Sequence, residues 1–368
     1  MHKIPLIKPF IPPEAKIRIC EVLDSGYLTE GPVTREFEEK CRRYIGCEQA
    51  IAVCNCTVGL EMALRAVGIG PGDEVIVPDY TYPATADAVA IVGATTVLVD
   101  VEPGTMLIDL EAAAAAITPR TKAIMPVSVF GNPLDYDQVK AFKNRYGLLV
   151  IEDAACSIGA EFDSKKVGNF ADISVFSHHP RKFITTGEGG LITTNNQAWA
   201  QWMDSYKHFG MGKTESREAT RFERIGTNYK LSNLQAALGV VQMDHIDALL
   251  DRRRILANRY YEKLRQEPKI SIPATTPKGL HSFQSCCVFV ENRDKVMASM
   301  RAQGIEVQIG TYALHQHPAF AQGPLCRWQT DFEGSRRAFD CALTLPLFHE
   351  LSMEDQDRVI TELIRTLA

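Results

Sequence analysis

The fold is indicated most directly by residues 148–155, which read Leu148-Leu149-Val150-Ile151-Glu152-Asp153-Ala154-Ala155. An unbroken apolar run of this kind is typical of a strand that is buried on both faces of a parallel sheet. The run ends in two carboxylates, and the carboxyl end of such a strand is the edge where open α/β sheets bind their ligands. We therefore expect an α/β fold with Asp153 at a ligand-binding edge of its sheet.

The same kind of pattern extends along the chain in both directions. Between residues 50 and 195, short β-branched runs alternate with helix-like stretches, as in a mostly parallel sheet that has helices on both faces. We predict strands at residues 74–77, 96–101, 123–127, 148–151, 173–176 and 191–193, and helices at residues 58–67, 84–92, 110–117 and 136–146.

Beyond residue 228 the pattern changes. Residues 231–249 predict one long helix, and residues 252–266 predict a second helix that is rich in charge. Pro273, Pro277 and Gly279 interrupt the chain before a predicted strand at 286–290 and predicted helices at 293–303, 334–342 and 353–367. We therefore expect a large domain over residues 1–249 and a smaller α+β domain over residues 250–368.

Composition and charge exclude several classes of protein. The 368 residues are 45% apolar and 23% charged, which is typical of a well-packed globular protein with two or three domains. Lys and Arg number 40 against 45 Asp and Glu, so the net charge of −5 provides no broad cationic surface for nucleic acid or anionic lipid. The one basic triplet, residues 252–254, is expected on a solvated helix face.

Membrane insertion and secretion are not expected either. No apolar run approaches the ~20 residues that a membrane helix needs. The first five residues lack the apolar stretch of a secretory signal. We expect a cytoplasmic protein that binds neither nucleic acid nor a membrane.

The cysteines and histidines predict neither a disulfide framework nor a metal site. The ten cysteines are scattered and form no CxxC pair, which favours reduced thiols. Two pairs of potential ligands are two residues apart: Cys54 with Cys56, and His315 with His317. Each pair lacks the further paired ligands that a tetrahedral zinc site requires, so we expect no metal.

A lysine and a carboxylate together indicate a cofactor site. Lys182 lies on a turn rich in Gly and Thr between two predicted strands, and Asp153 ends a third. Pyridoxal 5′-phosphate needs an amine, an anion at its ring nitrogen, an aromatic plate over its ring and donors for its phosphate. Lys182, Asp153 and Tyr82 match the first three needs. Thr57, at the start of a predicted helix, and the Ser177 hydroxyl match the fourth, so the sequence predicts this cofactor.

The motifs around these residues resemble the DegT/DnrJ/StrS family of sugar aminotransferases, a branch of the fold type I enzymes that use pyridoxal phosphate. The resemblance covers nearly the whole chain, at residues 23–32, 71–78, 152–155, 177–182, 184–190, 226–232 and 343–348. It implies a mixed, mostly parallel sheet of about seven strands sandwiched by helices, with a smaller C-terminal α+β domain. It also implies that the N-terminal segment, residues 1–32, lies near the active site.

The resemblance implies a role for each site residue. Lys182 would form the covalent bond to the cofactor, Asp153 would pair with the ring nitrogen, and Tyr82 would stack on the ring. In such enzymes Asn228 reaches the cofactor phosphate of the neighbouring subunit, which implies a homodimer with shared active sites. The remaining implied contacts are those of Thr57, Ser177 and the backbone amides of Cys56 and Val58 with the phosphate, and those of Tyr312 and His315 with the sugar.

Three residues depart from the pattern of the family. Cys56 replaces a small Gly or Ala, which leaves its backbone able to contact phosphate. Cys156 falls where Gln or His often meets the cofactor's ring hydroxyl, so we place it beside the cofactor. His178 replaces a frequent Phe and, with His179 and Arg181, adds polar or cationic groups near the reactive lysine. A phosphate-rich substrate, which would make His179 and Arg181 substrate contacts, and a surface-exposed turn explain these groups equally well.

The leading hypothesis for function is transamination. The resemblance implies that glutamate converts the cofactor to pyridoxamine 5′-phosphate, and that the amino group then passes to a nucleotide-linked keto-sugar such as a 4-keto-6-deoxyhexose. Two alternatives stay open: a regulator that binds the cofactor without turnover, and another fold type I enzyme such as a lyase or a desulfurase. The lysine at position 182 argues against the dehydratase branch of the family, which has His there.

Overall fold

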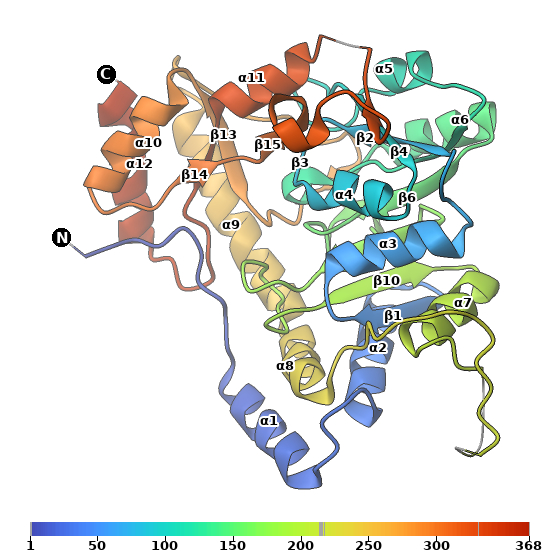
Figure 1. The fold of residues 1–368 in the computed structure, drawn as a ribbon. Helices are drawn as coiled ribbons and strands as arrows, with labels where there is room; N and C mark the ends of the chain where they lie inside the picture. Colours follow the sequence, from blue (N-terminus) through green and yellow to red (C-terminus); the bar gives the residue numbers. More distant parts are fainter. Residues whose placement is uncertain (1, 213–215, 217, 330, 368) are drawn as a thin grey trace.

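The computed structural model describes residues 2–212, 216, 218–329 and 331–367, and its centre is one large sheet (Figure 1). The strands of this sheet are β1 (Gln49–Val53), β2 (Glu74–Pro78), β4 (Thr95–Val99), β5 (Thr121–Ile124), β6 (Leu149–Asp153), β9 (Ile173–Ser177), β10 (Gly190–Thr194) and β16 (Cys326–Arg327). Over the described residues they number eight, in the order β1-β10-β9-β6-β5-β2-β4-β16. Only β10 among them runs antiparallel to its neighbours, so the predicted mixed, mostly parallel sheet is confirmed.

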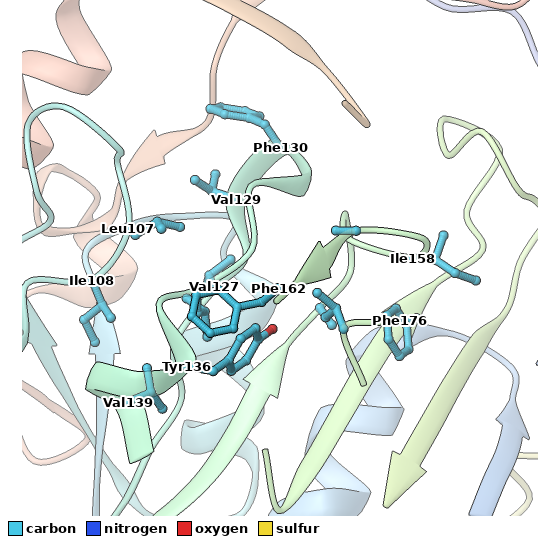
Figure 2. Packing of buried hydrophobic residues seen from close by; sticks show 14 of the residues in the cluster. Leu107, Ile108, Val127, Val129, Phe130, Tyr136, Val139, Ile158, Phe162 and Phe176 are labelled. Atoms are coloured by element: carbon cyan, nitrogen blue, oxygen red, sulfur yellow. The ribbon is translucent and has the colours of Figure 1, made fainter. Parts of the chain in front are cut away.

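Helices cover both faces of the large sheet. One face carries α3 (Cys56–Ala66), α4 (Ala84–Ile91) and α7 (Gln197–Lys207), whose apolar side chains pack on the sheet around Leu60, Val89 and Met203. The other face carries α2 (Pro32–Ile45), α5 (Leu110–Ala115), α6 (Tyr136–Tyr146) and α8 (Asn233–Asp244). There Tyr136 and Phe162 pack edge to face, with ring centroids 5.6 Å apart (Figure 2). Burial on both faces explains why the strand sequences are continuously apolar.

The C-terminal part of the chain forms a second, smaller sheet with its own apolar core. Its strands are β11 (Ile270–Ser271), β13 (Cys286–Val290), β14 (Gln308–Ile309) and β17 (Ala342–Leu345), in the antiparallel order β11-β13-β17-β14. The helices around it are α9 (Ile246–Leu264), α10 (Arg293–Ala302), α11 (Glu333–Cys341) and α12 (Met353–Leu367). Leu256, Met300 and Leu363 are fully buried in this core.

Shorter elements join the two sheets. The N-terminal segment reaches the C-terminal part first, where Ile4 forms a parallel bridge with Ile305, and then enters α1 (Pro13–Ser25), which packs on α8. The remaining short strands are β3 (Tyr80–Thr81), β7 (Glu161–Phe162), β8 (Lys165–Lys166), β12 (Gly279–Leu280) and β15 (Tyr312–Ala313). Among the described helices, none is both long and apolar enough to cross a membrane.

The prediction of one helix over residues 231–249 is wrong. A capping box between Ser232 and Gln235 starts α8, which ends at Asp244, and α9 then runs without a break through residues 249–252. The predicted break followed the onset of charge at residues 252–254. The predicted domain boundary at 249/250 therefore falls inside α9, and the division into two domains stays a prediction.

The basic triplet in α9 is not a solvated face, contrary to expectation. Arg252, Arg253 and Arg254 all donate hydrogen bonds to backbone carbonyls of neighbouring segments. Arg253 is only 3% exposed. These contacts attach the second half of the chain to α9, so the charge serves packing rather than solubility.

A buried ion pair attaches β16, the eighth strand, to the edge of the large sheet. Arg327 donates two hydrogen bonds to Glu74, from Nε at 3.1 Å and from Nη2 at 2.7 Å. The Thr118 hydroxyl and Arg120 also donate to this carboxylate. Burial raises the pKa of Glu74, but the hydrogen bonds from Arg327 and Thr118 outweigh it and lower this pKa to about 2.

We expect Arg327→Met to lower the free energy of unfolding by about 3 kcal/mol at neutral pH, because it leaves a buried carboxylate without its bidentate partner. Thr118 and Arg120 remain, which keeps the loss at the low end of the usual range. Urea denaturation measures the difference. Arg120→Met is the matched control, since this side chain is 60% exposed and its loss should cost much less.

The loss should also depend on pH. In the wild type the contribution of Glu74 is complete above the ordinary carboxyl pKa of 4.5 and is lost as the pH falls toward 2. In the Arg327→Met variant Glu74 takes up its proton at a higher pH, which relieves the unpaired charge. The difference should therefore shrink on acidification; a constant difference would attribute it to packing alone.

Candidate active site

A cavity of about 700 Å³ lies at the carboxyl ends of the central strands and brings most of the predicted site residues together. The N-terminal segment contributes Leu6 and Ile7 to its wall, and the C-terminal sheet contributes residues near Ile309 and Leu345. The predicted site residues that line it are Cys56, Thr57, Tyr82, Asp153, Cys156, Ser177, His179, Arg181 and Lys182. Val58, Asn228, Tyr312 and His315 are described but are not among the lining residues.

Asp153 ends β6 with its carboxylate buried in this cavity. Its Oδ2 accepts a hydrogen bond from the Thr85 hydroxyl at 2.7 Å, and its Oδ1 accepts one from the Ala155 amide at 3.1 Å. Burial raises the pKa of Asp153 despite these two hydrogen bonds. Among the described residues it forms no ion pair, so the site offers a buried anion that a cationic ligand would stabilise.

The neighbouring carboxylate of Glu152 serves structure instead. Successive side chains of a strand point to opposite faces, so Glu152 lies on the other side of β6. It accepts hydrogen bonds from the hydroxyls of Ser128, Tyr136 and Ser174 at 2.5, 2.6 and 2.9 Å. Strand geometry therefore decides which of the two acids can meet a ligand.

Thr85 is a site residue that sequence reasoning missed. It lies in the first turn of α4, and its hydroxyl also contacts that of Thr81 at 2.8 Å. The signal in the sequence was the pair of threonines four residues apart behind β2, which shares the sheet edge with Asp153. The contact with Asp153 itself joins segments 68 residues apart and has no local pattern.

Lys182 brings an amine to the same cavity. Its Nζ lies 2.9 Å from the Cys156 sulfur, and its backbone amide donates to the His179 carbonyl at 2.8 Å. Burial alone would lower the pKa of Lys182. The Cys156 sulfur and the Asp153 carboxylate raise this pKa by more than burial lowers it, so the net shift is upward. Cys156, predicted beside the cofactor, therefore contacts the lysine directly.

The second buried lysine, Lys207, is not available for chemistry. Its Nζ lies 3.1 Å from Glu30, 3.3 Å from Glu38 and 3.5 Å from Asp204. Glu30, Asp204 and His208 bring potential metal ligands within 4.8 Å of one another, and the Lys207 ammonium already pairs with both carboxylates of this group. These contacts hold Lys207 in a structural ion-pair cluster.

The N-terminus of α3 lies at one end of the cavity. The Asn55 side chain caps this helix by accepting from the Val58 amide at 3.0 Å, so that amide is already engaged. Gly190 allows β10 to pass close by, since a Cβ there would lie 2.7 Å from the Asn55 backbone. Thr57 lines the cavity beside this helix end, and the Ser177 hydroxyl, which accepts from the His179 amide at 3.3 Å, lies on its wall.

The side chain of Cys56, which also lines the cavity at this end, contacts the protein backbone. Its sulfur contacts the Val175 carbonyl at 3.8 Å, and burial raises the pKa of the Cys56 thiol well above its ordinary value. The thiol is therefore neutral, and the contribution of Cys56 to a phosphate site would come from its backbone.

Tyr82 lines the cavity, whereas Tyr312 and His315 do not. Tyr82 is 65% exposed, and its ring centroid is 6.1 Å from that of Tyr312. His315 is held by the buried Asp79, whose carboxylate lies 2.7 Å from both its Nδ1 and its backbone amide. Its ring also stacks on Phe332. The structure therefore gives His315 a fixed orientation without placing it on the cavity wall.

The expectation that His178 adds a polar or cationic group near Lys182 is wrong. His178 is fully buried, and its ring meets Phe37 edge to face at 5.3 Å. Burial lowers the pKa of His178 to about 4, so the ring is neutral at pH 7. His179 and Arg181 do line the cavity, and Arg181 is exposed.

Asn228 lies on the surface of its own chain. It forms an isolated bridge with His208, and its side-chain oxygen accepts from Lys230 Nζ at 2.5 Å. Exposed apolar side chains flank it in the sequence, including Phe222 and Ile225, which are 67% and 94% exposed. This position is compatible with a contact to a second subunit and not with one to the cavity of the same chain.

Comparisons with known proteins agree on one family. A family model described as the DegT/DnrJ/EryC1/StrS aminotransferase family matches residues 11–364. GDP-perosamine synthase from Caulobacter vibrioides is 37% identical over 100% of this chain and 99% of its own length. The spore coat polysaccharide biosynthesis protein SpsC from Bacillus subtilis is 34% identical over 98% of this chain and 96% of its own.

A solved structure extends this similarity to three dimensions. The crystal structure of a DegT DnrJ EryC1 StrS aminotransferase from Brucella abortus matches with a TM-score of 0.90 at 33% identity. The match covers 96% of this chain and 95% of that chain.

The burial of His178 predicts an acid-sensitive stability. In the folded protein the His178 ring has a pKa of about 4, whereas in the unfolded chain it takes up its proton at the ordinary pKa of 6.5. The unfolded state therefore binds more protons between these values, and the wild type loses stability as the pH falls from 6.5 to 4, by at most a few kcal/mol.

We expect His178→Phe to stay within about 1 kcal/mol of the wild type at pH 7, because it loses the long 3.3 Å contact of Nδ1 with the Ile184 carbonyl but also removes the buried Nε2, which has no described partner. It should become the more stable protein as the pH approaches 4. Urea denaturation at both ends of this range measures the crossover. Parallel stability curves for the two proteins would mean that His178 does not control this pH dependence.

Proposed function

Because the chain belongs to the DegT/DnrJ/EryC1/StrS aminotransferase family, it is a sugar aminotransferase, and we propose that it transfers an amino group from glutamate to a nucleotide-linked keto-sugar. Enzymes of this family depend on pyridoxal 5′-phosphate. The finer parts of this proposal are the amino donor, the 4-keto-6-deoxyhexose type of sugar, and the residues that do the work.

The observation that carries the proposal is the shared cavity of Lys182 and Asp153. The buried Asp153 carboxylate forms no ion pair with a described residue, and its pKa is raised by burial although Lys182 opposes this shift. A protonated ring nitrogen would lower that pKa again by direct charge pairing. Lys182 supplies the one amine among the lining residues that the structure describes. The residues present therefore fit the cofactor of the family.

We propose the following division of work among the residues of the chain. When bound, pyridoxal phosphate supplies an electron-withdrawing ring that makes the Cα proton of the amino acid removable. Lys182 would hold the cofactor covalently and, once released, would move that proton. Asp153 would keep the ring nitrogen protonated, with Thr85 fixing its carboxylate, and Tyr82 would cover the ring.

The phosphate of the cofactor would lie at the N-terminus of α3. Free backbone amides and the positive end of the helix dipole favour an anion at such a position. Thr57 and Ser177 offer hydroxyls on the same wall of the cavity. Of the two amides predicted to assist, that of Cys56 is favoured over that of Val58, which the Asn55 cap already uses.

The substrate proposal follows from the relatives and from the mouth of the cavity. One similar protein is a GDP-perosamine synthase and another acts in polysaccharide biosynthesis, so we propose a nucleotide-linked sugar as the acceptor here. Arg181 and His179 would meet its phosphates or the carboxylates of glutamate. Tyr312 and His315 would contact the sugar from the outer side.

We expect Lys182 to carry the cofactor. Reduction of the holoenzyme with borohydride, followed by peptide mapping, should place the pyridoxyl group on Lys182, and Lys182→Ala should abolish turnover while still binding the cofactor without a covalent bond. Addition of glutamate to the unreduced enzyme should shift the absorbance to that of the pyridoxamine form. An adduct on Lys207 would contradict the assignment of Lys182 as the residue that carries the cofactor. No spectral change with glutamate would contradict transamination in favour of a lyase or a non-catalytic regulator.

We further propose a homodimer in which Asn228 serves the active site of the neighbouring subunit. The residue is exposed and lies outside the cavity of its own chain, and the flanking residues Phe222 and Ile225 present apolar surface. A partner that covers this surface would remove it from water. The side-chain amide of Asn228 would then donate to the cofactor phosphate across the interface.

Shared sites predict complementation between two inactive variants. In a hybrid dimer of Lys182→Ala and Asn228→Asp, one of the two sites has an intact Lys182 from one chain and an intact Asn228 from the other. Mixing the variants should restore up to roughly a quarter of the wild-type activity, because half of the dimers are hybrids and each has one intact site. The assay follows amino-sugar formation after subunit exchange.

The control is a pair of variants within a single site. Lys182→Ala mixed with Asp153→Asn should recover no activity, because both residues come from the same chain and every hybrid site is defective. Equal recovery in both mixtures, or none in either after subunit exchange is demonstrated, would rule out the proposed role of Asn228.

A further inference from the structure

The side chain of Gln284 contacts the backbone on both sides of Lys182. Its Oε1 accepts a hydrogen bond from the Phe183 amide at 3.2 Å, and its Nε2 donates one to the Arg181 carbonyl at 2.8 Å. Gln284 is 5% exposed and lines the same cavity as the lysine. One side-chain amide thus binds the two peptide groups that flank the Cα of Lys182.

This arrangement restrains the lysine more than a single hydrogen bond would. The Arg181 carbonyl belongs to the peptide that precedes Lys182, and the Phe183 amide belongs to the peptide that follows it. Fixing both peptide planes limits the φ and ψ angles of the residue between them, since each residue has only these two soft backbone dihedrals. Gln284 therefore restrains the direction in which the Lys182 side chain leaves the backbone, together with the hydrogen bond from the Lys182 amide to the His179 carbonyl.

Gln284 is held in turn by the buried Arg253 of α9. The guanidinium donates from Nε to the Phe283 carbonyl at 2.8 Å and from Nη2 to the Gln284 carbonyl at 2.7 Å. It also lies 5.3 Å from the centre of the Phe183 ring, next to the lysine. Phe283 has a φ of 51°, a left-handed conformation that is uncommon for a residue with a side chain.

The burial of Arg253 is costly, which indicates that its position matters. It is 3% exposed and forms no ion pair with a described residue. Burial lowers the pKa of Arg253 to about 9, far below the ordinary value of a guanidinium. A buried charge that is compensated only by carbonyl oxygens and an aromatic ring requires well-placed partners.

We propose that Gln284 is a positioning residue for Lys182 and that Arg253 fixes Gln284, so that α9 determines where the reactive amine lies. The inference rests on the proposed role of Lys182 as the residue that binds the cofactor. Neither residue would touch the reacting atoms. Their effect would pass through the backbone of residues 181–183.

The first test compares Gln284→Met with the wild type. Methionine keeps the length of the side chain but can neither accept from Phe183 nor donate to Arg181. We expect capture of pyridoxal phosphate by Lys182, followed as the absorbance of the covalent complex after mixing with the cofactor-free protein, to slow on the order of tenfold or more, because small misplacements of a reacting group are costly. The pH titration of that absorbance should shift as well.

Gln235→Met is the matched control. Gln235 donates from Nε2 to the Glu188 carbonyl at 2.9 Å, at the far end of the same turn, and does not flank Lys182. This substitution also replaces a glutamine whose side-chain amide contacts the turn that carries Lys182. It should therefore leave both the capture rate and the titration near those of the wild type, even if it lowers stability.

Gln284→Glu provides a second variant that can be rescued. Its carboxylate can still accept from the Phe183 amide but repels the Arg181 carbonyl, whereas the protonated acid can donate to that carbonyl. Burial raises the pKa of such a group, whereas the Arg253 guanidinium and the Lys182 amine nearby lower it, so a deficit relative to the wild type that shrinks between about pH 8 and about pH 5 would support the positioning role. Arg253→Lys, which cannot reach both carbonyls, should resemble Gln284→Met.

The outcomes separate the two proposals. If borohydride mapping of the wild type places the cofactor on another residue, the proposed function fails. If the cofactor is on Lys182, but Gln284→Met captures it at the wild-type rate with an unshifted titration, only the positioning role fails. If Gln284→Met does not fold, Gln284→Glu at pH 8 decides, because its charged carboxylate cannot donate to the Arg181 carbonyl: capture of the cofactor at the wild-type rate by that variant would refute the positioning role.

Discussion

The site depends on one constraint: the carboxylate of Asp153 is buried at the end of a central strand, and no cation among the described residues forms an ion pair with it, although the Lys182 amine lies close enough to act on its pKa. Two hydrogen bonds, from Thr85 and Ala155, hold it in place but do not offset the loss of water around the charge. A charge in this situation is stabilised by an opposite charge brought in by a ligand. A cationic ring bound beside Asp153 would therefore offset the unfavourable burial of this carboxylate.

The fold places the two charged groups of the site in the same cavity. Asp153 faces the cavity because strand alternation turns Glu152 to the other side, where three hydroxyls satisfy it. Lys182 approaches from the turn between β9 and β10, the one antiparallel strand of the described sheet. That turn is held from outside the large sheet: by Gln242 of α8, which accepts from the Thr185 amide at 2.6 Å, and by Gln284, which Arg253 of α9 supports.

The sequence allowed the main elements and the two central charges of the site to be predicted, because these depend on local patterns. Apolar runs marked the strands, and the acid and the lysine stood at strand ends. The missed features depend on contacts between distant segments. The contact of Thr85 with Asp153, the contacts of Gln284 and the burial of His178 have no local signature, since each is defined by a partner that the fold supplies. The break at His245 was missed because α8 and α9 are both good helix sequences, and tertiary packing decides where one ends.

The pairing of β16 with β4 has a consequence for how the protein is made. Cys326 lies beside Thr96, and Ile4 beside Ile305, so both the edge of the large sheet and the place of the N-terminal segment wait for residues near the end of the chain. On the ribosome, the first strands emerge long before these partners do. Until then the unpaired edge of β4 and the apolar N-terminal residues remain open to other chains. The edge of the large sheet and the place of the N-terminal segment are therefore completed only when the last part of the chain is available.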